Sequence, residues 1–181
     1  MSFAHNMSCS SQAFRCVVWP IIQHEQWLGP GDFELVEDQS DYLRRSFDIL
    51  AGIDLWHIDT ARGMRGIASR IQWGCNFQTF TIRYSTASGA RTEFQKRLEA
   101  IENPDEGWAF PIFTVQAYIS GGRGSSEVAS VAIVPTRQLI EYARDNIMNL
   151  TIQSNSEDGN QFLVVPWTRL PGVQIWERPR N

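Results

Sequence analysis

Short segments rich in β-branched and aromatic residues recur along the chain, and this recurrence limits its fold more than any other feature. Each segment has the length of an ordinary strand and is bounded by glycine, proline or polar turn residues. We expect strands at residues 53–58, 67–73, 77–84, 112–119, 128–134, 162–165 and 173–176. Several intervals between them repeat apolar residues at helical spacing, so the chain combines strands with helices.

Helical spacing appears in three segments outside the expected strands. Residues 32–50 carry apolar side chains at roughly helical intervals, and Gly52 can end that helix. Thr92 and Glu93 open a second helix, and Pro135 stands at the start of a third. The order is one helix, three strands, one helix, two strands, one helix and one or two strands. This order predicts an α+β (mixed α/β) fold in which helices flank a central mixed sheet.

The chain has 181 residues, the length of one ordinary domain, and no linker, repeat or low-complexity tract divides it. We therefore expect a single domain over residues 1–181. Within it, residues 1–31 form an irregular N-terminal segment, residues 32–119 the core and residues 120–181 a C-terminal extension of strand, helix and strand. The strand that ends the core should form a hairpin with the next strand. The second helix is a candidate parallel crossover.

Composition argues against several classes of protein. Hydrophobic residues make up 43% and charged residues 20% of the chain, which favours a sizeable core over wholesale disorder. No apolar run approaches the roughly 18 residues that cross a bilayer, and the start lacks the pattern of a signal peptide. Cys9, Cys16 and Cys75 form neither a disulfide framework nor a CxxC pair. These features predict a cytoplasmic protein with reduced thiols and no membrane partner.

Charge is unevenly distributed along the chain. The net charge of −4 argues against a general polyanion binder. However, residues 24–60 hold nine acidic residues and two arginines, whereas residues 61–100 hold six arginines and one lysine against two acidic residues. Arginine forms bidentate contacts with phosphate and carboxylate, so the basic block is a candidate nucleic-acid-binding surface. Its candidate contact residues are Arg62, Arg65, Arg83, Arg91 and Arg97.

The strands expected at 53–58 and 67–73 carry polar side chains that could meet. Asp54 lies near the start of the first strand, just after a helix and a glycine. Arg70 and Gln72 share one face of the second strand, because side chains alternate along a strand with a period of two. If the two strands are neighbours, these three side chains converge at one end of the sheet.

The stretch that includes these strands resembles the PD-(D/E)xK nuclease superfamily. Residues 52–54 (GID) and 66–72 (GIASRIQ) are similar to the local pattern of that family, in which a metal-binding aspartate precedes a strand with a (D/E/Q)-x-K pair. The resemblance covers roughly residues 34–119. It implies a restriction-endonuclease-like αβββαβ core, and it implies that Asp54 is the metal-binding aspartate.

The lysine of the family motif is missing from the second strand, which leaves two registers. In one register, Gln72 takes the acid or amide position and Gly74 falls where the lysine belongs. In the other register, Arg70 takes the amide position and Gln72 the lysine position. Lys96, on the next helix, could be a relocated lysine, as in some members of the family. Alternatively, the site is inactive and the chain only binds.

Phosphodiester hydrolysis of this kind uses a hard divalent cation that polarises the phosphate and generates hydroxide. The resemblance implies Mg²⁺ or Mn²⁺, held by Asp54, the Gln72 amide oxygen and an acid of the first helix. Candidates for that acid are Glu34, Glu37, Asp38 and Asp41. We take Glu37 as the third ligand. Arg70 or Lys96 would stabilise the developing charge, since arginine does not give up its proton.

These features predict a metal-dependent nuclease or a nuclease-like DNA-processing protein, with an Mg²⁺-dependent endonuclease as its enzymatic form. The alternative is a catalytically inactive binding or assembly module of a phage, mobile element or defence complex. The expected partner is nucleic acid, most simply DNA, in the first case, and a second copy or another protein in the second. An unrelated α+β enzyme or small-ligand binder is a third interpretation. Each residue also has a structural interpretation: Asp54 can cap a loop, and Arg70 and Gln72 can form a solvated strand face.

Overall fold

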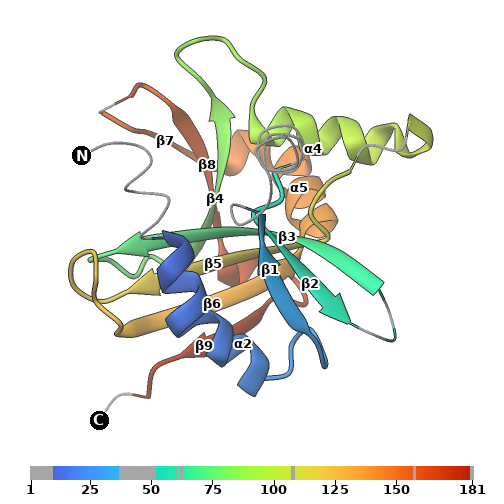
Figure 1. Cartoon of the computed structure of the whole chain (residues 1–181). Helices are drawn as coiled ribbons and strands as arrows, with labels where there is room; N and C mark the ends of the chain where they lie inside the picture. The colour runs from blue at the N-terminus through green and yellow to red at the C-terminus, as the bar shows by residue number, and fades with distance from the viewer. Residues whose placement is uncertain are drawn as a thin grey trace.

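The computed structural model describes residues 10–36, 52–59, 61, 63–106, 109–156 and 158–179, and Figure 1 shows how the elements are arranged. Its helices are the π-helix η1 (Phe14–Val18), α2 (Trp19–His24), α4 (Glu93–Glu102), α5 (Thr136–Asp145) and the 3₁₀ turns η4 (Pro104–Glu106), η5 (Ile147–Asn149) and η6 (Trp167–Arg169). Its strands are β1 (Asp32–Leu35), β2 (Leu55–Asp59), β3 (Gly63–Trp73), β4 (Thr79–Ser85), β5 (Phe113–Ile119), β6 (Val128–Pro135), β7 (Thr151–Ser154), β8 (Gln161–Pro166) and β9 (Gln174–Glu177). This combination confirms the expected α+β fold.

Six strands form the central sheet in the order β1-β2-β3-β5-β6-β9. β3 and β5 run parallel, with Ile67 opposite Phe113, whereas the other described pairs of this sheet are antiparallel. The chain passes from β3 to β5 through β4 and α4, so the expected parallel crossover is confirmed. β5 and β6 form the expected hairpin, and β9 lies at one edge of the sheet.

β4 does not follow its neighbours into the central sheet. It pairs with β8 in a second, three-stranded sheet of order β4-β8-β7, which we call the small sheet. Apolar side chains account for this departure from three consecutive strands in one sheet. Phe80 and Ile82 of β4 and Leu163 and Val165 of β8 are buried in one cluster, so the two strands share a core-facing side.

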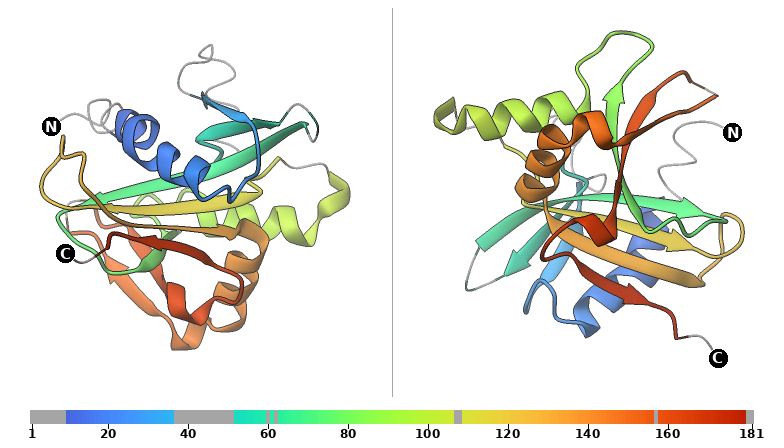
Figure 2. Two further views of the ribbon diagram at one scale, coloured as in Figure 1. Left: turned by 90° about the horizontal axis from the view of Figure 1, so that it is seen from below. Right: turned by 180° about the vertical axis from the view of Figure 1, so that it is seen from behind.

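The central sheet is covered on both faces, as two further views show (Figure 2). On one face, η1 and α2 pack apolar side chains against the strands. Phe14, Val18 and Ile22 join Leu55 and Val115 in one buried cluster there. On the opposite face lie α4, α5 and the small sheet, which enclose a second apolar cluster. The central sheet therefore divides the core into two layers.

The N-terminal segment expected to be irregular is helical from Phe14 to His24. Phe14, Val18 and Ile22 recur every four residues, so they lie on one helical face, and all three are buried. Pro20 lies in the first turn of α2, where its missing N–H costs little. The apolar spacing was therefore a helical signal despite the proline.

The helix expected at 32–50 is wrong at its start, because Asp32–Leu35 forms β1, which pairs with β2. Phe33 and Leu35 lie two residues apart and share one face of the strand. Residues 37–50 of that expected helix lie outside the described residues. β7 was not expected, because all four of its residues are exposed and lack apolar alternation. Within the described ranges, no helix is long and apolar enough to span a membrane.

Candidate functional site

Polar side chains occupy one face of the two parallel strands β3 and β5. Arg70 and Gln72 of β3 lie opposite Gln116 and Tyr118 of β5 in register. Gln116 is only 1% exposed, and Tyr118 is fully buried in the layer that contains α5 and the small sheet. Buried polar groups require hydrogen-bond partners, so this face depends on a network of contacts from the neighbouring elements.

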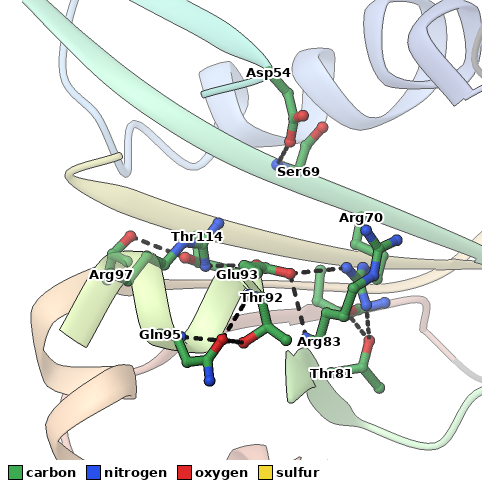
Figure 3. Close-up of polar contacts among 12 residues, drawn as sticks. Asp54, Ser69, Arg70, Thr81, Arg83, Thr92, Glu93, Gln95, Arg97 and Thr114 are labelled. Carbon is green, nitrogen blue, oxygen red and sulfur yellow. Dashed lines mark hydrogen bonds and ion pairs between the residues drawn. The ribbon is translucent and has the colours of Figure 1, made fainter. Parts of the chain in front are cut away.

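Glu93 is the centre of this network (Figure 3). It lies in the first turn of α4, which begins with a capping box between Thr92 and Gln95. Its carboxylate forms ion pairs with Arg97 of the same helix at 2.7 Å and with Arg70 of β3 at 3.0 Å. We call Glu93, Arg70 and Arg97 the Glu93 cluster. The cluster joins the start of α4 to the central sheet.

The Glu93 carboxylate is held in its ionised form. Burial raises its pKa, but the charges of Arg97 and Arg70 and a hydrogen bond from the Arg83 backbone N–H outweigh burial, so the pKa lies below its ordinary value. Arg97 is 2% exposed, and burial lowers its pKa against the opposing charges of Glu93 and Asp54. The buried guanidinium therefore depends on its carboxylate partners.

Arg70 is fixed by three partners. Its guanidinium donates to Thr81 Oγ1 at 3.1 Å and to Glu93 Oε2 at 3.0 Å, and its central carbon lies 5.1 Å from the centroid of the Phe162 ring on β8. The exposed Arg83 of β4 approaches the same ring at 5.9 Å. Both are cation–π distances. Two guanidinium groups therefore contact one aromatic side chain beside the Glu93 cluster.

Two amide groups of the polar face have atoms without partners in the described part of the chain. The Gln116 carbonyl oxygen accepts a hydrogen bond from Thr81 at 3.4 Å, but its Nε2 is buried without a partner. Gln72 Oε1, on the neighbouring strand, is likewise buried without one. An unpaired buried polar group costs about 1–3 kcal/mol. This face is therefore less stable than a fully paired one.

Asp54 lies just before β2, where its carboxylate accepts a hydrogen bond from the Ser69 backbone N–H. The register of β2 and β3 puts Asp54 opposite Ala68, four residues before Gln72. At about 3.3 Å per residue, Gln72 lies roughly 13 Å further along the sheet. A divalent ion holds its oxygen ligands within about 2.6 Å. Asp54 and Gln72 therefore do not fit one Mg²⁺ or Mn²⁺ site, contrary to the expected convergence.

Glu37, Arg62 and Lys96 were also expected at the site. Glu37, the expected third ligand, and Arg62 lie outside the described residues. Lys96 is half-buried on α4, three residues after Glu93. Within the described ranges, no three histidine, cysteine or acidic side chains are placed to hold a metal ion. Of the expected site residues, the structure brings Arg70 and Arg97 together, because both form ion pairs with Glu93.

The arginines expected to bind nucleic acid occupy unlike environments. Arg83 is exposed beside Phe162. Arg91 is exposed and forms an ion pair with Glu99. The expectation that Arg97 contacts nucleic acid at the surface is wrong. Its guanidinium is buried in the Glu93 cluster and stabilises α4 instead. Arg65 belongs to a different cluster, on the opposite face of the sheet.

That second cluster contains His57, Asp59 and Arg65, and we call it the His57 cluster. His57 is fully buried, with Nδ1 2.9 Å from Arg65, which also donates to the Leu28 carbonyl oxygen at 2.6 Å. Asp59 lies 4.0 Å from the same guanidinium. Burial and the charge of Arg65 lower the pKa of His57. The Trp19 ring lies 5.8 Å from the imidazole, so this cluster supports the packing of α2 on β2.

Sequence reasoning missed three residues that build the site: Glu93, Thr81 and Phe162. Glu93 precedes Arg97 by four residues, the spacing of a helical ion pair, and this signal was present in the sequence. The contacts of Thr81 and Phe162 depend on how β4 and β8 pack against β3, which local spacing does not reveal.

The arrangement combines three kinds of chemistry at one place. Arg70 and Arg83 supply guanidinium groups that can pair with phosphate oxygens. Phe162 supplies an aromatic ring, and Glu93 an ionised carboxylate that orients Arg70. No protein-family model, curated protein or solved structure matches this chain.

Proposed function

We propose that this chain is a nuclease-like protein that binds nucleic acid through its phosphodiester backbone beside the Glu93 cluster. The observation that supports this is the approach of Arg70 and Arg83 to the same partly exposed ring. Arg70 is oriented by Thr81 and Glu93 before a ligand arrives. Such preorganisation reduces the conformational entropy that is lost when the guanidinium binds a phosphate.

The local charge favours an anionic ligand. Among the described residues that meet here, Arg70, Arg83 and Arg97 stand against the carboxylates of Glu93 and Asp54, which leaves an excess of one positive charge. The chain as a whole carries a net charge of −4, so the attraction depends on this local excess. A site of this kind binds the phosphates of one ligand at one place and does not make the whole protein a general polyanion binder.

Metal-dependent hydrolysis is the second candidate, and one observation favours it. The charges of Asp54 and Glu93 both act on Arg97, so carboxylates from the start of β2 and from α4 lie near one guanidinium. Because Asp54 and Gln72 do not fit one ion, we derive no hydrolytic step from them. Binding is therefore the function that the described geometry supports best. Hydrolysis is tested separately, by incubation of DNA with Mg²⁺ or Mn²⁺.

A fluorescence anisotropy titration with labelled DNA, in single-stranded and duplex form, tests the proposal. We expect binding whose equilibrium constant falls as salt rises, because bound phosphates release counterions. Arg70→Gln and Arg83→Gln should each weaken binding, and each lost phosphate contact should reduce the slope of log K against log salt by about 0.7–0.9. Arg137→Gln is the matched control, since Arg137 is an exposed arginine on α5.

Two outcomes would overturn the proposal: no binding of either DNA form at low salt, or an equal loss in all three arginine variants. Incubation of the same DNA with Mg²⁺ or Mn²⁺ then separates the two candidates. Cleavage that Asp54→Ala abolishes would favour the nuclease. Stable binding without cleavage would favour a catalytically inactive binding module.

A further inference from the structure

The small sheet has two unlike faces. Phe80 and Ile82 of β4 and Leu163 and Val165 of β8 are buried against α5 and the central sheet. Because side chains alternate along each strand, the other face carries the residues between them. We call this the outward face, and its residues are Thr81, Arg83, Thr151, Gln153, Phe162 and Val164. In Figure 1, α4 and α5 lie on the other side of the small sheet.

The outward face carries no negative charge of its own. β4, β7 and β8 contain neither aspartate, glutamate nor lysine, and Arg83 is the one charged residue of these strands. Arg70 adds a second guanidinium from β3, where it contacts Phe162. Glu93, which reaches the same region from α4, is neutralised by its ion pairs with Arg70 and Arg97. The face is therefore complementary in charge to a polyanion.

Phe162 adds a feature that phosphate binding alone does not need. The ring is only partly buried although its neighbour Leu163 is fully buried. Thr81 and Val164 flank it on the same face, and both are partly exposed. An aromatic ring on a sheet face, with arginines beside it, is the arrangement on which unpaired bases stack.

We propose that the ligand of this face is single-stranded nucleic acid, with a base stacked on the Phe162–Arg83 pair and the flanking phosphates on Arg83 and Arg70. This inference rests on the proposed function. A duplex keeps the flat faces of its bases stacked inside the helix, so it can offer only its phosphates to this face. A single strand can offer both, and it should therefore bind more tightly.

The experiment measures the affinity of one labelled DNA oligonucleotide as a single strand and as its duplex. Phe162→Leu keeps the apolar bulk and removes the stacking surface, so it should weaken single-strand binding about tenfold and weaken duplex binding much less, because the duplex loses only the contact that helps to orient Arg70. Phe162→Trp keeps a stacking surface and should restore single-strand affinity. Phe77→Leu is the matched control, because Phe77 is 66% exposed and lies outside the outward face. Thermal unfolding of each variant checks that it is folded.

Duplex binding at least as tight as single-strand binding, with no effect of Phe162→Leu, would overturn this inference while the proposed function stands. A loss in Phe162→Leu that Phe162→Trp does not restore would also overturn it, since packing rather than stacking would then explain the loss. Failure to bind either the single strand or the duplex would overturn the proposed function as well as this inference. Preferential single-strand binding that follows the aromatic character of residue 162 supports the inference.

Discussion

On one face of β5, Val115 and Ala117 are buried among apolar side chains, whereas on the other face the Gln116 amide and the Tyr118 hydroxyl are as deeply buried and have polar partners, although the Tyr118 ring belongs to the second apolar cluster. The backbone and the depth are the same, and only the neighbours differ. Apolar burial contributes roughly 25 cal/mol per Å² without directional requirements. A polar side chain contributes only when its partners are in place. The first face of β5 therefore stabilises the fold without directional contacts, whereas the polar groups on the second face contribute only through their specific partners.

The same contrast separates the two ionic clusters. The His57 cluster lies under α2, and its contacts join elements of the apolar layer. The Glu93 cluster lies between α4, β3 and β4, and Arg70 at its outer end is partly exposed. The His57 cluster is covered by α2, whereas the Glu93 cluster is in contact with solvent at Arg70. Substitutions on the first should change stability alone, whereas substitutions on the second should change ligand binding as well.

The largest effect is expected from the apolar face. Leu55→Ala should lower the free energy of unfolding by about 3 kcal/mol, because the buried side chain leaves a cavity beside Ile67 and Val115. Urea unfolding measures this change. The DNA affinity of the protein that remains folded should match wild type. A change in that affinity would contradict the division of roles between the two faces.

Glu93→Gln should lower the free energy of unfolding by about 2 kcal/mol. The substitution leaves the Arg97 guanidinium buried with a weaker partner, and the partial exposure of Glu93 reduces the cost relative to a fully buried pair. Glu99→Gln, on the same helix, removes an exposed pair with Arg91 and should cost less than about 0.5 kcal/mol. Equal losses in the two variants would show that the Glu93 cluster is no more than a surface contact.

Thr81→Val should cost about 1 kcal/mol, because it removes the hydroxyl shared by Arg70 and Gln116 without changing the volume of the side chain. Urea unfolding gives the stability, and anisotropy gives the DNA affinity. Affinity should fall with it, since Arg70 loses one of the contacts that orient it. Retained affinity would mean that Glu93 and Phe162 suffice to place Arg70.

As pH falls, the protein should lose first the stability contributed by the His57 cluster and then that contributed by the Glu93 cluster. The pKa of His57 is lowered, so the unfolded chain takes up the proton first, and the stability that His57 contributes is lost as pH falls below about 6.5. Arg65, Asp59 and Asp32 are the charged groups that act on it. The pKa of Glu93 is also lowered, so its contribution is present above about 4.3 and is lost as pH falls through the lowered value.

Urea unfolding at a series of pH values separates these two losses. His57→Gln should flatten the dependence between about pH 7 and 5 and leave the part below it. Glu93→Gln should do the reverse. A wild-type slope between about pH 7 and 5 in His57→Gln would show that another group titrates there.

Much of the fold could be predicted because its signals are local. The β-rich segments, the capping residue Thr92 and the turn before Val128 each reveal an element without reference to the rest of the chain. β1 was missed because apolar residues after Leu35 continued at helical spacing and hid the strand. β7 was missed because an exposed strand lacks the alternation that burial imposes.

The site was less predictable, because its geometry depends on register and layer packing. Period-two alternation placed Arg70 and Gln72 on one face correctly, but it gave no position for Asp54 along the neighbouring strand. The antiparallel register then separated Asp54 from Gln72. Glu93 reaches Arg70 only because the first turn of α4 lies beside β3, a relation between segments that no local pattern contains.

The parallel pairing of β3 with β5 has a consequence for how the chain reaches this state. Ile67 and Phe113 must meet across all of β4 and α4, whereas β5 and β6 meet across one short loop. Closing the longer loop costs more entropy, and such non-local pairings slow folding. We expect the hairpin early and the β3–β5 seam late in refolding. The Glu93 cluster joins β3 to α4, which lies within the loop that this pairing closes, so the capacity to bind a ligand should emerge late in assembly.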